Sequence, residues 1–121
     1  MLNLPFNKLQ IWGKGMNLVN LVYEMSKSFP KEERYGLISQ IRRSAVSVPS
    51  NIAEGSQRKS NKEFANFILI SKGSLAELQT QLIISLKQQY IKESDLKLVM
   101  DEIIELDKML FAFHKKLTTY N

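Results

Sequence analysis

The stretch DLKLVMDEIIELDKMLFAFHKKL, residues 95–117, decides the fold class of this 121-residue chain. Its apolar residues recur at spacings of three and four from Leu96 to Leu117, which is the stripe of an amphipathic helix. The charged residues fall on the other side of that helix: Lys97, Asp101, Glu105, Lys108 and Lys115. This segment predicts a helix with one buried face and one solvated face.

Three segments upstream repeat the pattern, with stripes that begin at Ile11, Ile38 and Phe64. None alternates with the period of two that strands require, so we expect helices only, at about residues 8–28, 32–54, 61–90 and 94–117. Short connections make consecutive helices antiparallel neighbours. The sequence therefore predicts an all-α, antiparallel up-down-up-down four-helix bundle that occupies residues 1–121 as a single domain.

The breaks between the segments have chemistry of their own. The ring of Pro30 disfavours helical geometry at Phe29 and ends the first helix. Gly55 is expected as the left-handed residue that follows the second helix. Ser60 and Glu63 match a capping box that opens the third.

Composition excludes several classes of protein. The chain has no cysteine, which excludes disulfides and thiolate chemistry. No apolar run approaches the roughly 18 to 20 residues of a membrane span, and the N-terminus lacks the pattern of a signal peptide. We therefore expect a soluble, cytoplasmic protein with no membrane partner.

The formal net charge of +5 is concentrated in one half of the sequence. Residues 1–60 hold nine Lys and Arg against four Glu, whereas residues 61–121 hold eight Lys against eight Asp and Glu. A basic bias of this kind favours polyanions as partners without specifying one.

The first and third helices carry more apolar residues than one core face needs. A helix that is apolar nearly all round is usually buried on more than one side, so these residues predict an oligomer; a wide core stripe with scattered exposed apolar residues is the alternative. The predicted interface residues are Trp12, Met16, Val19, Tyr23, Leu69, Ile70 and Ile84.

Arg42 and Arg43 form the most obvious basic pair. Arg43 is expected on the outer side of the second helix with Ser47 and Ser50, where it could contact phosphate. From the residues alone, a salt bridge from Arg43 to a neighbouring carboxylate is the better interpretation.

A second basic cluster, Arg58, Lys59 and Lys62, lies in the turn before the third helix. Free backbone donors at the start of a helix could hold an anion there. A solvated charged loop is the simpler alternative.

Catalysis has little support in the sequence. His114 is the only histidine, and Phe111 stands where a helical Glu-x-x-His metal site needs its glutamate. The carboxylates Glu54, Glu63 and Glu77 could bind a divalent ion if the fold brought them together, but nothing in their spacing requires it. We expect no catalytic residue, no metal and no cofactor.

The run QIRRSAVSVPSNIAEG, residues 40–55, is distinctive. Together with Arg58, Ser60 and Glu63 it resembles the 23S rRNA-intervening-sequence proteins, a family of four-helix bundles. The resemblance covers about residues 6–115. The positions that match the family pattern are Arg42, Arg43, Asn51, Glu54, Gly55, Arg58 and Ser60.

The resemblance implies a bacterial protein, and a relation to the accessory variability protein of diversity-generating retroelements. That relative is a barrel-shaped pentamer of four-helix bundles that associates with nucleic acid and a reverse transcriptase. It has a basic surface. The family implies no catalytic residues.

Three hypotheses follow for the function. The leading one is a non-enzymatic homopentamer that binds structured RNA or DNA electrostatically, through Arg42, Arg43, Arg58, Lys59 and Lys62. The alternative is a protein-binding adaptor with no direct nucleic-acid role, which would use the outer faces of the first and third helices. A metal-dependent enzyme would need ordered metal at Glu54 or Glu63.

Overall fold

The computed structural model describes residues 4–119, and they form four helices. These are α1 (Gln10–Ser26), α2 (Leu37–Ser56), α3 (Asn61–Lys87) and α4 (Glu93–Thr119), with a short 3₁₀ helix, η1 (Lys31–Glu33), before α2. No strand occurs among the described residues. The predicted all-α fold is confirmed.

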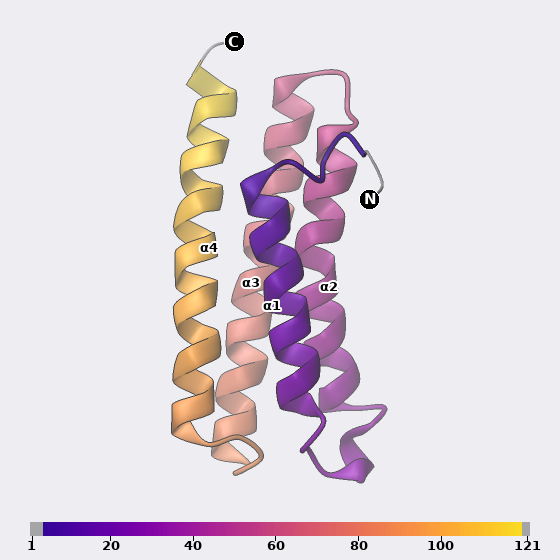
Figure 1. The fold of residues 1–121 in the computed structure, drawn as a ribbon, viewed down its shortest axis with the longest axis vertical. Helices are drawn as coiled ribbons and strands as arrows, with labels where there is room; N and C mark the ends of the chain where they lie inside the picture. Colours follow the sequence, from indigo (N-terminus) through magenta and orange to yellow (C-terminus); the bar gives the residue numbers. More distant parts are fainter. Residues whose placement is uncertain (1–3, 120–121) are drawn as a thin grey trace.

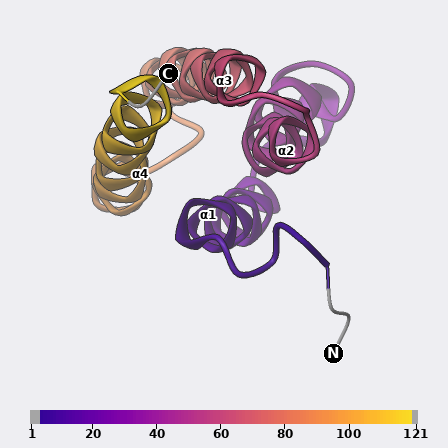
Figure 2. The same cartoon turned by 90° about the horizontal axis from the view of Figure 1, so that it is seen from above.

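The chain runs down α1, up α2, down α3 and up α4 (Figure 1). Seen along its long axis, the bundle is a square in which α1 and α3 stand at opposite corners (Figure 2). Contacts join α1 and α3 each to α2 and α4 but not to one another. The outer sides of α1 and α3 therefore lie on opposite sides of the bundle.

Each of the four predicted stripes lies in the core. Fully buried side chains include Val22 of α1, Ile41 of α2, Leu78 of α3 and Ile103 of α4. Burying a large aliphatic side chain stabilises the fold by about 1.5–3 kcal/mol, so this shared core is the main term that holds the bundle together.

The second helix begins at Leu37, five residues later than expected, because Glu33 is used as a cap. One carboxylate oxygen of Glu33 accepts a hydrogen bond from the backbone N–H of Leu37 (3.0 Å) and the other accepts one from the Tyr90 hydroxyl (3.1 Å). A single side chain thus starts α2 and ties it to the end of α3.

The third helix ends at Lys87, three residues earlier than expected. Gln89 adopts a left-handed conformation with φ 64°. The backbone N–H of Tyr90 then donates to the Ser85 carbonyl oxygen (2.9 Å), and the backbone N–H of Gln89 donates to the Leu86 carbonyl oxygen (2.9 Å). This pair of hydrogen bonds is the Schellman motif. No glycine marks this helix end in the sequence.

Candidate nucleic-acid interface

Nearly all the net charge lies at one end of the bundle, which we call the basic end: residues 4–9, 54–63 and 114–119. The start of α1, the α2–α3 connection and the end of α4 meet there (Figure 1). Two glutamates, Glu54 and Glu63, oppose six cations at this end: Lys8, Arg58, Lys59, Lys62, Lys115 and Lys116. At the opposite end, residues 24–36 and 87–95, five cations balance five carboxylates. The excess of positive charge in the first half of the sequence therefore becomes, in the fold, an excess of positive charge at one end of the long axis.

Three of these six cations, Lys8, Lys115 and Lys116, were absent from the predicted site. They are far in sequence from Arg58, Lys59 and Lys62 and join them only because the antiparallel topology returns α4 to the start of α1. Lys59, Lys62 and Lys115 are exposed, and none forms a salt bridge among residues 4–119. Their full charge is available to a partner.

Arg58 is partly neutralised by its own neighbours. Its guanidinium donates to the Glu54 carboxylate at 2.8 Å and lies 4.8 Å from the centre of the Phe67 ring. Because the ion pair is exposed, its contribution to stability is small. Arg58 can exchange Glu54 for another anion at little cost.

The start of α3, where the sequence suggested an anion site, is capped by residues of the chain itself. The Ser60 hydroxyl oxygen accepts a hydrogen bond from the backbone N–H of Glu63 (3.2 Å), and the hydroxyl lies 3.2 Å from the Glu63 carboxylate. The predicted cap at Ser60 is thus confirmed. An anion bound there would have to meet the negative charge of Glu63.

Arg42, predicted to bind nucleic acid, contacts α1 in the structure. Its Nε donates to the Ser26 hydroxyl (2.8 Å), its Nη2 donates to the Tyr23 carbonyl (3.4 Å), and its guanidinium lies 4.5 Å from the Tyr23 ring centre. The side chain therefore holds the last turn of α1 against α2.

Arg43, its neighbour, is exposed. The salt bridge preferred for Arg43 from the sequence is wrong, because no carboxylate among residues 4–119 lies within ion-pair distance of it. Arg43 lies in the middle of α2, away from the basic end.

The distinctive run at residues 40–55 serves helix packing. Asn51 donates to the Ser47 carbonyl (2.8 Å) and to the Ser47 hydroxyl (3.0 Å), which is itself 2.8 Å from the Ser74 hydroxyl of α3. Gly55 is helical and has no positive φ, so its expected left-handed role is wrong. It lies at a close approach of α2 to α3, since an added Cβ would stand 2.6 Å from the Cβ of Phe67.

The predicted interface residues of α1 line a groove with α2, which we call the α1–α2 groove. Trp12, Met16 and Val19 form one wall, and Val46, Pro49 and Ala53 form the other, around a volume of about 360 Å³. The sequence missed the α2 wall. Tyr23 remains 39% exposed, although Arg42 covers one face of its ring.

The predicted interface residues of α3 form a second apolar surface, which we call the α3 face. Leu69, Ile70 and Ile84 are between 43% and 50% exposed. Ile104 and Phe111 of α4, at 45% and 61% exposure, were missed by the sequence analysis. Large apolar side chains exposed in one area usually mark an interaction surface.

The register of α3 against α4 places Phe111 at the edge of the α3 face. Lys72 of α3 pairs with Asp107 (2.7 Å) and lies 5.8 Å from the Phe111 ring centre. Since α1 and α3 are diagonal, this surface and the α1–α2 groove occupy different sides of the bundle.

Nothing in the described part of the chain resembles a metal centre. Residues 4–119 contain no group of three His, Cys, Asp or Glu side chains that could hold an ion. Glu54 and Glu63 are instead engaged with Arg58 and Ser60. No described helix is long and apolar enough to cross a membrane.

Among residues 4–119, two pKa values are displaced, and both belong to contacts between segments that are distant in sequence. Hydrogen bonds to Glu105 and then Glu102 raise the pKa of Lys14, and the hydrogen bond to Glu33 raises that of Tyr90. Neither group lies at the basic end. Each raised pKa favours the protonated side chain, which is the form that donates the hydrogen bond to the glutamate.

Comparisons with known proteins agree with the fold. The profile of the 23S rRNA-intervening sequence protein family matches residues 7–112. A crystal structure of a protein with unknown function from the S23 ribosomal protein family of Bacteroides thetaiotaomicron VPI-5482 superposes with a TM-score of 0.80. It shares 23% sequence identity, and the match covers 87% of this chain and 98% of that one. A comparison with curated protein sequences gives no match.

Proposed function

This chain belongs to the 23S rRNA-intervening sequence protein family, and we propose that it is a non-enzymatic, oligomeric protein that binds structured RNA or DNA through its basic end. The observation that carries the proposal is the excess of six cations over two carboxylates at that end. Phosphate contacts of this kind supply affinity without sequence preference, and the affinity falls steeply with salt. The proposed setting is the cytoplasm of a bacterium.

The test compares two triple variants with the same change in charge. Lys59, Lys62 and Lys115 are replaced by Glu at the basic end, and Lys31, Arg34 and Lys87 are replaced by Glu at the opposite end. Binding of a fluorescent RNA hairpin and a DNA duplex is measured by anisotropy between about 50 and 200 mM salt. We expect the basic-end variant to lose binding and to reduce the salt slope by about 3 or more.

The opposite-end variant controls for net charge. Equal losses in the two variants would mean that only overall charge matters, and the basic end would then not be the interface. Binding that survives in both variants with little salt dependence would reject the electrostatic mechanism.

The proposed oligomer is a ring, with five copies as its proposed number. It is supported by two different apolar surfaces, the α1–α2 groove and the α3 face, on different sides of one subunit. Surfaces that differ pair head to tail, and such heterologous contacts close into rings when the rotation permits. Parallel subunits in a ring would bring all the basic ends to one rim.

Two single variants distinguish this arrangement from a two-fold dimer. Val46→Glu spoils the α1–α2 groove and Ile70→Glu spoils the α3 face, so each variant alone should be monomeric by sedimentation. Mixed together, they retain one intact interface and should form a one-to-one heterodimer and nothing larger. A dimer formed by either variant alone would contradict head-to-tail pairing, and Leu98→Glu, at a site 60% exposed outside both surfaces, is the control.

The second candidate is a protein-binding adaptor with no direct nucleic-acid role. It is favoured by the same exposed apolar side chains, such as Met16 and Ile70, if they dock another polypeptide. This function predicts partner recovery that survives nuclease treatment and nucleic-acid binding that is weak and insensitive to salt.

A further inference from the structure

Helix α1 is too short to cover α4. It has 17 residues and α4 has 27, so at 1.5 Å per residue α1 is about 15 Å shorter. Lys14 pairs with Glu102 (3.2 Å) and Glu105 (3.1 Å), which fixes the antiparallel register of the two helices. The shortfall therefore lies beside the last turns of α4.

Residues 4–9, which precede α1, do not fill this space. They lead away from α4 (Figure 2), and the centre of the Phe6 ring lies 5.3 Å from that of the Trp12 ring, which lines the α1–α2 groove on the other side of α1. Phe64 of α3 packs against Phe113, with 5.2 Å between the ring centres, so the last turns of α4 are covered on their α3 side. On the side that faces α1, no described helix lies next to them.

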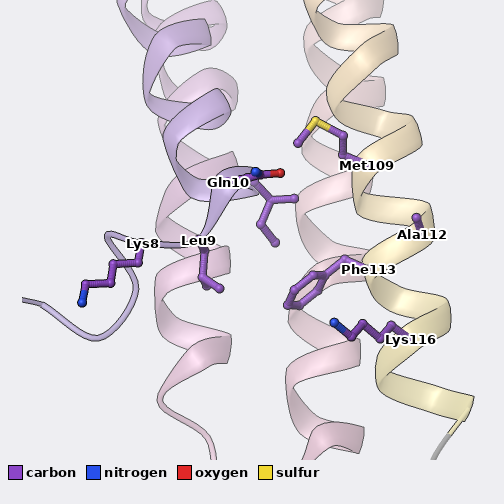
Figure 3. A pocket seen from close by; sticks show the side chains of 8 residues that line it. Lys8, Leu9, Gln10, Met109, Ala112, Phe113 and Lys116 are labelled. Atoms are coloured by element: carbon purple, nitrogen blue, oxygen red, sulfur yellow. The ribbon is translucent and has the colours of Figure 1, made fainter.

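The result is a groove of about 420 Å³ between the start of α1 and the end of α4, which we call the α1–α4 groove. Leu9 and Ile11 line one side, and Met109, Ala112 and Phe113 line the other. Met109 and Phe113 point from α4 toward the start of α1, and Lys116 points the same way beside the Phe113 ring (Figure 3). The walls are apolar and the groove is open along its length.

The charges around the α1–α4 groove are of one sign. Lys8 and Lys116 flank it, and neither forms a salt bridge among residues 4–119. The first turn of α1 has no acidic residue, and Leu9 at its N-cap provides no side-chain cap. The positive end of the α1 dipole therefore also faces this region uncompensated.

We propose that the α1–α4 groove binds an acidic amphipathic helix of a partner protein, which takes the place of the turns that α1 lacks. A helix suits an open groove, because its apolar side chains at spacings of three and four would fill the gap between Leu9 and Phe113. Its flanking carboxylates would meet Lys8, Lys116 and the start of α1. This site is distinct from the two surfaces proposed for the ring, and its partner is a polypeptide and not a nucleic acid.

The test uses a designed peptide of about four helical turns, with leucines at alternating spacings of three and four and glutamates beside them. A second peptide has the same leucines but lysine in place of every glutamate. Binding to the full chain is followed by methyl NMR of labelled Ile, Leu and Met side chains. We expect the acidic peptide to shift the signals of Leu9, Ile11 and Met109, and the basic peptide to bind at least about tenfold more weakly, since like charges oppose it.

Two variants with the same charge change locate the site. Ala112→Glu places a carboxylate in the groove, whereas Leu98→Glu places one on α4 at an exposed site outside the groove and outside both surfaces proposed for the ring. The first should weaken the acidic peptide at least about tenfold and the second by less than about twofold. The Lys59, Lys62 and Lys115 triple variant separates the two proposals, because none of these lysines lines the groove. It should lose nucleic-acid binding while the acidic peptide still shifts Leu9, Ile11 and Met109.

Three results would overturn the proposal. Equal peptide affinity in the two variants would place the peptide elsewhere, as would shifts confined to Met16 in the α1–α2 groove. Shifts of Leu9 and Ile11 that appear on concentrating the protein alone would mean that a second copy fills the groove.

Discussion

Gly55 of α2 and Phe67 of α3 approach so closely that a Cβ added to the glycine would stand 2.6 Å from the Phe67 Cβ. The same added atom would be 2.9 Å from Cδ1 of Phe64. Because a Cβ is fixed to the backbone, Phe67 cannot turn aside, and the helices themselves would have to separate. The close packing of α2 against α3 near their connection thus requires glycine at position 55.

Gly55→Ala should destabilise the protein by about 1–3 kcal/mol, the range for an overpacked core, even though alanine favours a helix by about 1 kcal/mol over glycine. Gly73→Ala is the control, since an added Cβ there meets nothing within 4 Å. That change should stabilise α3 by about 0.5–1 kcal/mol. Urea denaturation measures both, and a stabilising Gly55→Ala would show that α2 and α3 are not packed in this way.

Arg42→Ala and Arg43→Ala should have different effects although the residues are adjacent. Arg42 bonds the Ser26 hydroxyl and the Tyr23 carbonyl, so its loss should cost about 1.5–3 kcal/mol, the range for hydrogen bonds to charged groups. Arg43→Ala should change stability by less than about 0.5 kcal/mol.

Affinity for a polyanion is a second measurement that distinguishes Arg42→Ala from Arg43→Ala. Once both variants are compared below their unfolding temperatures, Arg42→Ala should bind a DNA duplex no more weakly than Arg43→Ala. A larger loss of binding in Arg42→Ala would restore Arg42 as an interface residue.

Ser60→Ala should cost about 1 kcal/mol, because it removes the oxygen that accepts the Glu63 backbone N–H at the start of α3. Ser28→Ala is a suitable comparison, since the exposed Ser28 hydroxyl only donates to the Met25 carbonyl of the preceding turn. Thermal unfolding of the two variants measures the difference. Equal melting temperatures would mean that the cap contributes nothing.

Tyr90 should make the protein less stable in alkali. The Glu33 carboxylate raises the pKa of Tyr90 above its ordinary value of 10.0, so the native state holds this proton more tightly than the unfolded chain does. The contribution is complete below pH 10.0 and is lost as the pH rises through the raised pKa.

Tyr90→Phe removes that contribution. The variant should be less stable than the parent at neutral pH, and the difference between them should shrink above pH 10.0, the ordinary pKa of the hydroxyl. Tyr35→Phe, at a site 89% exposed, should match the parent throughout. A difference that stays constant with pH would show that the Tyr90–Glu33 bond is not formed.

The periodic stripes predicted the helices well because a helix in a bundle must bury one face. Burial of one face requires apolar residues at spacings of three and four, which can be read from the local sequence. Helix ends depended on contacts from elsewhere. The start of α2 uses the Glu33 side chain, which also binds Tyr90 across the bundle, and the end of α3 uses a left-handed Gln89. Neither feature has a local sequence signal as strong as Pro30 or Ser60.

The candidate site was predicted only in part, since its cations come from three separate segments. Arg58, Lys59 and Lys62 could be grouped because they are adjacent in sequence, whereas Lys8 and Lys116 join them only through the topology. A sequence shows that Arg42 is basic but not that Ser26 and Tyr23 already bind it, so its binding role stays a prediction. The predicted antiparallel topology already implied that Lys115 and Lys116 lie near Arg58, but the sequence analysis grouped cations only by their nearness along the chain.

The separation of charge along the bundle gives the molecule a permanent electric dipole moment. In the field of a nucleic acid, such a dipole experiences a torque that turns the α2–α3 connection forward before contact. Collisions then become productive without a search over all orientations, so the rate of association, more than the lifetime of the complex, should depend on ionic strength. An elongated bundle with its charge at one end is therefore suited to rapid capture of a polyanion, whatever partner its grooves hold afterwards.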